Sequence, residues 1–326
     1  MIDVLIPVAK KDLYLLQNAI NKLIENSLTP IRKIFVVLED DAIPVLNNID
    51  IEIVFLNERI YPFSKDDIKE IILNKNGDIS STSWYFQQLL KLYSFRVITD
   101  VLPRLLIHDV DIYFNKKIEF INQEGKSILS CGYPFYWVNN AQNPLKDYVS
   151  SSEHTHSHIH HAKKLITDFE IKSVYSGMHH HQLIESCILE EFLSKVENKF
   201  NKKFWYIFIN EIDQKKWTSA SEYVLYLHYA LKFHRNKVLT RHVSSVELIC
   251  DANIPNNYIE NCLMETNDYE IVGRHKFNGL KKRFQTMDYF SEELRQEVLN
   301  EFSENNVFLF KLYSGVLNIS KNNNIL

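Results

Sequence analysis

Short, unbroken apolar runs that alternate with segments of helical periodicity limit the fold of this chain more than any other feature. Val4–Ile6 and Ile34–Leu38 are continuous apolar runs, and Ile51–Leu56 is nearly continuous. Runs of this kind are typical of strands that are covered on both faces. Apolar residues at helical spacing occupy the stretch from Asp12 to Asn26, where Asp12 can cap the first turn. The alternation predicts an α/β fold, with helices packed on both faces of a mixed sheet.

The rest of the chain extends this pattern. We expect a long helix from Trp84 to Leu102, which Pro103 ends, and a strand at Arg104–His108. In the second half we expect an aromatic strand at Phe204–Ile209. We also expect helices at His179–Val196, Ser219–Phe233 and Ser291–Phe302, with Ser291 as the N-cap of the last one. No Pro/Ser-rich linker and no internal repeat is present, so we expect a single extended domain.

Composition excludes several classes of protein. The 326 residues are 45% hydrophobic and 13% aromatic, which suits a substantial core and not a disordered chain. The 37 Lys and Arg residues against 41 Asp and Glu residues give a net charge of −4, so a general nucleic-acid coat is not expected. The 7 glycines are too scattered to form either glycine-rich phosphate loop. If the chain binds a nucleotide, another group must neutralise the phosphates.

Cysteine usage and the N-terminal residues bear on the compartment. The 4 cysteines are far apart and form no C-x-x-C pair, which is typical of reduced thiols. Met1–Pro7 lacks the basic region and long apolar stretch of a signal peptide, and no run approaches the ~20 apolar residues of a membrane span. These features predict a cytoplasmic protein with no membrane span.

Two aspartates directly follow the Arg104–His108 strand. In an extended segment the side chains of Asp109 and Asp111 point the same way, because they are two residues apart. Two carboxylates held that close oppose each other's ionisation unless a cation lies between them. Oxygen ligands suit Mg²⁺ or Mn²⁺, and ligands of open α/β sheets gather at the carboxyl ends of strands. A divalent-metal site is one interpretation, and an ordinary acidic turn is the other.

These residues also carry a resemblance. Asp109-Val110-Asp111 after a Leu/Ile strand is similar to the D-x-D motif of glycosyltransferases with the GT-A fold. The segment Trp84–Leu92 resembles the W-x-x-Q-Q-x-x-K-L helix of a family of bacterial and viral domains assigned to that fold. Asp3–Val8 and Ser221-Glu222-Tyr223 match further landmarks of the family in the same order. The resemblance covers roughly residues 1–245 and implies a Rossmann-like catalytic domain, with residues 246–326 as an extension packed on it.

The resemblance implies an activity. It implies that a sugar moves from a nucleotide-diphosphate donor, with a UDP-sugar favoured, to a glycan or other hydroxyl acceptor, with the help of Mn²⁺ or Mg²⁺. The residues that would contact the donor follow the first strand, lie on the helix before the acidic pair or adjoin that pair: Pro7, Val8, Lys11, Asp12, Gln88, Lys91, His108 and Asp109. Asp12 is equally explained as a helix cap, and Lys91 as part of a solvated helix face.

Further site residues also follow from the resemblance. His179 and His180 are expected to contact substrate, and a later histidine is expected to join Asp109 and Asp111 as third metal ligand. We assign that position to His242, with His275 as the alternative. Glu222 is a candidate general base that would deprotonate the acceptor hydroxyl with inversion. It also completes an S-x-x-E capping box with Ser219, which is a purely structural role.

Some alternatives stay open. The histidines between His154 and His161 could bind Zn²⁺ through same-side imidazoles, or they could form a plain surface loop. Paired aspartates also occur in metal-dependent phosphohydrolases, although there the pair usually follows the first strand. A non-catalytic module that binds a nucleotide sugar or a glycan would use the same donor residues without turnover.

Overall fold

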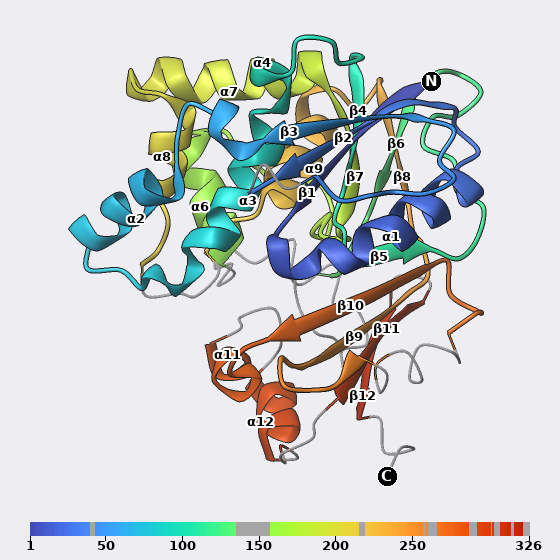
Figure 1. Cartoon of the computed structure of the whole chain (residues 1–326). Coiled ribbons are helices and arrows are strands. Elements are labelled where there is room, and N and C mark those ends of the chain that lie inside the picture. Colours follow the sequence, from blue (N-terminus) through green and yellow to red (C-terminus); the bar gives the residue numbers. More distant parts are fainter. Residues whose placement is uncertain are drawn as a thin grey trace.

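The computed structural model shows two five-stranded β-sheets, one above the other in Figure 1, with most of the helices around the upper one. The structure describes residues 1–39, 43–134, 157–214, 219–256, 259, 266–286, 292–300, 302, 307–313 and 316–321. Within these ranges, no helix combines the length and the apolar composition that crossing a bilayer requires.

The first sheet is built from the apolar runs of the N-terminal half. Its strand order is β3-β2-β1-β4-β7, and the first four strands run parallel while β7 pairs with β4 in the opposite direction. The strands are β1 (Ile2–Val8), β2 (Ile31–Leu38), β3 (Glu52–Asn57), β4 (Arg104–His108) and β7 (His181–Glu185). The expected α/β fold with a mixed sheet is therefore present, and that sheet is mostly parallel.

Alternate residues of the strands pack into two separate hydrophobic clusters. Leu5 of β1 belongs to one cluster, while its neighbours Val4 and Ile6 belong to the other. Helix α1 (Leu13–Asn26) covers the face of Val4 and Ile6. The opposite face is covered by α2 (Lys65–Asn74), α3 (Thr82–Leu92), α6 (Ser157–Leu165), α7 (Ser186–Phe200), α8 (Phe204–Asn210) and α9 (Glu222–Phe233). Both faces are buried, which is why the strands have continuous apolar sequences.

The second sheet joins the C-terminal part of the chain to the end of the D-x-D segment. Its order is β12-β11-β9-β10-β5. The strands are β5 (Ile112–Phe114), β9 (Ser245–Asp251), β10 (Ile271–Phe277), β11 (Val307–Tyr313) and β12 (Val316–Lys321), and α11 (Leu280–Thr286) and α12 (Glu292–Asn300) pack beside them. Since β5 begins one residue after Asp111, the acidic segment passes from one sheet to the other (Figure 1).

A third, two-stranded sheet pairs β6 (Ser127–Ser130) with β8 (Val238–Arg241) in parallel. It is held to the first sheet by side chains. The backbone N–H of Ser130 donates to the amide oxygen of Gln182 on β7 at 2.9 Å, and the amide nitrogen of Gln182 donates to the Ser130 carbonyl at 3.1 Å. These hydrogen bonds anchor β7, the strand that begins at His181.

Two of the expected elements in the second half are wrong. Phe204–Ile209 forms helix α8 rather than a strand; its buried residues Phe204, Ile207 and Phe208 have helical spacing, which a short aromatic run conceals. Of the expected helix at His179–Val196, the first part is strand β7, and the helix begins only at Ser186. The partner strand β4 decides this, because β7 completes the edge of the first sheet.

Two helix boundaries also differ from the prediction. The expected helix from Trp84 to Leu102 stops at Leu92, and a separate short helix, α4 (Ser94–Val97), follows. Helix α9 begins at Glu222, and its N-cap is Ser221, whose side chain accepts from the N–H of Val224. The capping box of Ser219 and Glu222 is therefore not formed. The Ser219 hydroxyl instead accepts from the N–H of Asp213 at 2.9 Å.

Candidate metal centre

The carboxyl edge of the first sheet collects the chemically active side chains. Strands β1 and β4 are parallel, so the segments that follow them, including Asp12 and Asp109, leave the sheet at the same edge. Because β7 is antiparallel to β4, its first residues start at that edge, which brings in His180. The second sheet adds His275 through the pairing of β10 with β5.

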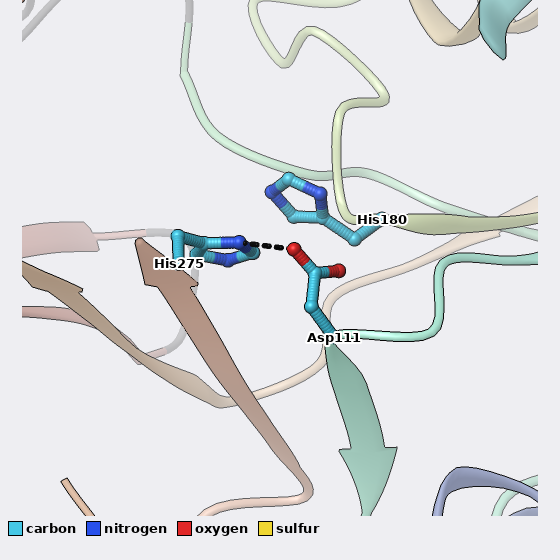
Figure 2. A group of neighbouring side chains, drawn as sticks. All are labelled: Asp111, His180 and His275. Carbon is cyan, nitrogen blue, oxygen red and sulfur yellow. Dashed lines mark hydrogen bonds and ion pairs between the residues drawn. The ribbon is translucent and has the colours of Figure 1, made fainter. Parts of the chain in front are cut away.

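Three of these side chains meet closely enough to hold a metal ion. Asp111, His180 and His275 each present one ligand atom, and these atoms lie within 4.8 Å of one another. Figure 2 shows the three side chains directed toward a common point from three different segments. Nδ1 of His275 lies 2.7 Å from Oδ2 of Asp111. The Asp111 and His180 side chains are each 31% exposed and that of His275 is 5% exposed, so the group is partly accessible to solvent.

The donor set fits a transition metal better than Mg²⁺. Two imidazole nitrogens and one carboxylate oxygen suit Mn²⁺, Fe²⁺ or Zn²⁺, whereas Mg²⁺ prefers oxygen ligands and retains several waters. Burial disfavours a charged His275, yet Asp111 and Glu247 outweigh this and raise the pKa of His275 well above its usual value. Nε2 of His275 lies 3.4 Å from Oε2 of Glu247, outside hydrogen-bond geometry in this structure.

The expected clamp of two aspartates differs from what the structure shows. Oδ1 of Asp109 lies 2.6 Å from Nζ of Lys91, while Asp111 faces His275. The period-two argument does not apply because the chain turns here: the N–H of Ile112 donates to the carbonyl of Asp109. Lys91 thus already balances Asp109, and only Asp111 of the pair belongs to the three-residue group, although Oδ2 of Asp109 is 3.3 Å from Nδ1 of His180.

Lys91 joins the acidic segment to helix α9. Its Nζ also lies 2.7 Å from Oε1 of Glu222, and the lysine and glutamate side chains are 2% and 4% exposed. Gln88, one turn earlier on α3, accepts from the N–H of Glu222 through its amide oxygen at 3.0 Å. Burial raises the pKa of Glu222, and the neighbouring Lys91 only partly offsets this. The predicted donor contacts at Gln88 and Lys91 are therefore buried and taken up by protein groups.

For both Asp109 and Lys91, burial shifts the pKa in one direction and the charged neighbours shift it in the other. For Asp109, burial favours the neutral acid, but Lys91 and His180 together hold its pKa well below the usual range. For Lys91, burial favours the neutral amine, but Asp109 and Glu222 raise its pKa above the usual value. Both groups are thus charged at neutral pH, and they form a buried ion pair next to the three-residue group of Asp111, His180 and His275.

Sequence reasoning missed Glu247, a buried carboxylate on β9 that is 2% exposed. Its Oε2 lies 3.4 Å from Nε2 of His275 and 3.5 Å from Nε2 of His180. Burial raises its pKa, with His275 acting in the other direction. A signal was present in the sequence, since Glu247 is the single charged residue in the apolar run Val246–Cys250. A lone acid in a buried strand indicates a partner that local spacing does not identify.

The other histidines take different positions. His242 packs its ring against Tyr175, at 4.4 Å between ring centroids, and is not part of the three-residue group; His275 takes that position. His179 is fully buried, and burial lowers its pKa to about 3. His108 is also fully buried, and burial lowers its pKa to about 4. His180 alone among these predicted residues lies both at the site and partly exposed.

The predicted residues at the end of β1 and directly after it lie at the expected edge of the first sheet. Pro7 and Val8 are buried within β1, so only their backbone could contact a ligand. Lys11 is exposed, and its Nζ lies 3.8 Å from Oδ2 of Asp12. Asp12 precedes α1 but makes no side-chain capping hydrogen bond. Burial raises the pKa of Asp12, and the charge of Asp111 acts in the same direction, which places Asp12 within electrostatic range of the site.

The described part of the histidine cluster between His154 and His161 is helical rather than extended. His154 and His156 lie outside the described residues, while His158 and His161 are buried on α6 and His160 is exposed. Nε2 of His161 is 2.9 Å from the carbonyl of Phe208, so this ring packs between helices. Within the described ranges, the cluster contributes to no metal-ligand group.

His180 has an unusual backbone. Its φ is 55°, in the left-handed region that residues other than glycine rarely adopt. The strain is held by a hydrogen bond from the N–H of Asp109 to the carbonyl of His180 at 2.9 Å. Strained residues of this kind cluster at functional sites. The backbone therefore favours a functional role for His180 independently of its side-chain contacts.

Comparison of the sequence with protein-family models and with curated proteins finds no match.

Proposed function

We propose that this protein is a glycosyltransferase that depends on a divalent metal and uses a nucleotide-diphosphate sugar, with a UDP-sugar favoured, to modify a hydroxyl acceptor. The observation that carries the proposal is the convergence of Asp111, His180 and His275 at the carboxyl edge of a mostly parallel sheet. Ligands of open α/β sheets bind at that edge. The order of the motifs at residues 3–8, 84–92, 109–111 and 221–223 supports the same activity.

The two imidazoles and one carboxylate would hold the cation, with Mn²⁺ as the ion that suits both donor types. When bound, such a cation supplies Lewis-acid stabilisation of the charge that develops on the departing nucleoside diphosphate. The scarcity of glycine supports this role, because the chain has no glycine-rich loop to cradle phosphates.

The surrounding residues would hold this centre in place. Lys91 keeps Asp109 ionised and directed toward His180. Glu222 stays a candidate base, but it is 3% exposed and bound to Lys91, so an acceptor hydroxyl has no direct approach to it in this arrangement. The geometry favours Glu222 as the group that positions Lys91. Asp12, whose pKa is raised by burial, is a more accessible carboxylate at the same edge.

The test is a transfer assay with a panel of nucleotide sugars and hydroxyl acceptors, with Mn²⁺ and with excess chelator. Release of nucleoside diphosphate and a mass increase of the acceptor are expected only with the metal. Asp111→Asn and His275→Ala should abolish transfer, while His242→Ala should retain it. Asp109→Asn should also abolish transfer, since Lys91 and His180 both lose a charged partner. Full activity of the Asp111 and Asp109 variants, or in chelator, would refute the proposal.

A metal-dependent phosphohydrolase is the second candidate. Three protein ligands on a partly exposed group leave room for a water molecule, as in catalytic metal sites. Products separate the two activities. Transfer breaks the bond between the anomeric carbon and oxygen and releases nucleoside diphosphate, whereas pyrophosphate hydrolysis yields nucleoside monophosphate and sugar phosphate. Binding of a nucleotide sugar with no turnover would instead favour a non-catalytic module.

A further inference from the structure

Glu247 is surrounded by imidazoles. Among the described residues, the ionic neighbours of its carboxylate are His275, His180 and His179, at 3.4, 3.5 and 4.0 Å. No lysine or arginine of the described chain lies within ion-pair distance of it. A carboxylate that is 2% exposed needs compensation from its neighbours, so these rings must supply hydrogen bonds or charge.

The two rings of the metal-ligand group have the same orientation with respect to their carboxylates. Nδ1 of His275 faces Asp111 at 2.7 Å, and Nδ1 of His180 faces Asp109 at 3.3 Å. Nε2 of each ring faces Oε2 of Glu247. A neutral imidazole has one N–H and one lone-pair nitrogen, so a ring that binds a cation through Nδ1 carries its proton on Nε2.

Gly273 allows the carboxylate to approach this closely. It is the register partner of Glu247 across β9 and β10 and lies two residues before His275 on the same face. A Cβ atom at position 273 would lie 2.9 Å from Cγ of Glu247 and 2.9 Å from Nε2 of His275. The space that a side chain would occupy is thus filled by the contact between these two residues.

We infer that Glu247 is the outer carboxylate shared by both histidine ligands. With the cation bound, it accepts the Nε2–H of His180 and of His275, which fixes the tautomer of both rings. Nδ1 of His275, on the Asp111 side, and Nδ1 of His180, on the Asp109 side, are then free to face the cation. Metal-bound histidines commonly donate their second N–H to a carboxylate, and loss of that partner lowers metal affinity about 10–100-fold. The inference rests on the metal site of the proposed function and not on sugar transfer.

The experiment measures Mn²⁺ binding by calorimetry for the full chain and for Glu247→Ala and Glu247→Gln. We expect a loss of affinity of about 10–100-fold for the alanine variant. The glutamine variant should lose less, because its amide oxygen still accepts from one ring. Glu270→Gln is the matched control: this carboxylate accepts from the N–H of Ser244 in the same part of the chain and does not contact the histidines, so affinity should not change.

A spectroscopic measurement separates an outer carboxylate from a direct ligand. With Co²⁺ in place of Mn²⁺, the visible bands of Glu247→Gln should keep the position and intensity of the parent, because the ligand set is unchanged. Altered coordination bands would overturn the inference in favour of direct ligation. Equal Mn²⁺ affinity in all Glu247 variants would also overturn it, while leaving the metal site and the proposed function standing.

Gly273→Ala tests the contact between Glu247 and His275 independently, because it leaves every polar group in place. The added methyl group would push Glu247 and His275 apart, so Mn²⁺ affinity should fall while urea unfolding still shows a folded chain. Parent-like affinity of a folded Gly273→Ala protein would contradict the close contact. Failure of the parent chain to bind any divalent cation would remove the proposed function and the inference together, and so is distinguishable from the other outcomes.

Discussion

Asp109 and His180 are joined twice, once through the backbone and once through the side chains. The N–H of Asp109 donates to the carbonyl of His180 at 2.9 Å, and Oδ2 of Asp109 lies 3.3 Å from Nδ1 of His180. The end of β4 and the start of β7 are therefore coupled at the point where the candidate metal centre forms. A change in either segment displaces a residue of the other.

The buried ion pair should be a major contributor to stability. Replacing Lys91 by Met leaves Asp109 and Glu222 buried without their cation, and we expect the free energy of unfolding to fall by about 3–5 kcal/mol. Urea unfolding at pH 7 measures this. Lys33→Met is the control, because Lys33 pairs with Asp100 and Glu52, whose side chains are 66% and 57% exposed, and this substitution should change stability far less than Lys91→Met. Similar effects of the two substitutions would contradict the assignment.

Metal binding should separate His242, the third ligand expected from the sequence, from His275, which the structure groups with Asp111 and His180. Excess Mn²⁺ should raise the melting temperature of the parent and of His242→Ala, but not that of His275→Ala, because ligand binding to the folded state adds stability. His180→Asn should also show no Mn²⁺-dependent shift. Its melting temperature without metal should match that of the parent, since asparagine tolerates the left-handed backbone at φ 55°. A normal shift in His275→Ala together with none in His242→Ala would reverse the assignment.

Acid should destabilise the protein through buried histidines that are not part of the Asp111, His180 and His275 group. Burial lowers the pKa of His161 to about 4 and that of His228 to about 3, while an unfolded histidine titrates near 6.5. Below pH 6.5 the unfolded chain therefore binds more protons than the folded chain. The contribution of these neutral histidines to the free energy of unfolding is fully present above pH 6.5. As the pH falls toward 4, each histidine lowers that free energy by about 1.4 kcal/mol per pH unit.

Urea unfolding between pH 7 and pH 5 measures that slope, and His228→Asn should reduce it. The N–H of Lys172 donates to Nδ1 of His228 at 3.0 Å, and an asparagine oxygen can accept the same bond without titrating. An unchanged slope in this variant would show that His228 does not stay neutral in the folded protein.

The turn before the histidines should tolerate no side chain at Gly177. Its φ is 80°, and a Cβ atom there would lie 2.8 Å from Cβ of Leu227. We expect Gly177→Ala to lower the free energy of unfolding by about 2–4 kcal/mol, from backbone strain and overpacking together, and to weaken Mn²⁺ binding by displacing His180. Gly125 has a similar φ of 78° with open space around it, so Gly125→Ala should lose only about 1 kcal/mol. Equal losses of unfolding free energy in Gly177→Ala and Gly125→Ala would show that backbone strain alone, without overpacking, accounts for the effect.

Local sequence predicted the four parallel strands of the first sheet but not β7, which was expected to be helix, and it predicted the second half less well. Arg104–His108 is a strand as expected, because a buried apolar run bounded by Pro103 has few alternatives. Phe204–Ile209 was misassigned because a six-residue aromatic run fits either a strand or a helix, and its neighbour α7 decides between them. Residues 246–326 lie outside the stretch that carries the family resemblance, yet they contain His275 and Glu247.

The sequence by itself determined the α/β class, the edge at which polar groups collect and the importance of the segment at Asp109–Asp111, because apolar periodicity and strand ends are local properties. Only the tertiary structure decided that Asp111 is grouped with His180 and His275 while Asp109 pairs with Lys91. Those partners are far apart in the chain and meet through the registers of β4 with β7 and of β5 with β10. Long-range strand pairing is set by packing of the whole core, which no local spacing encodes.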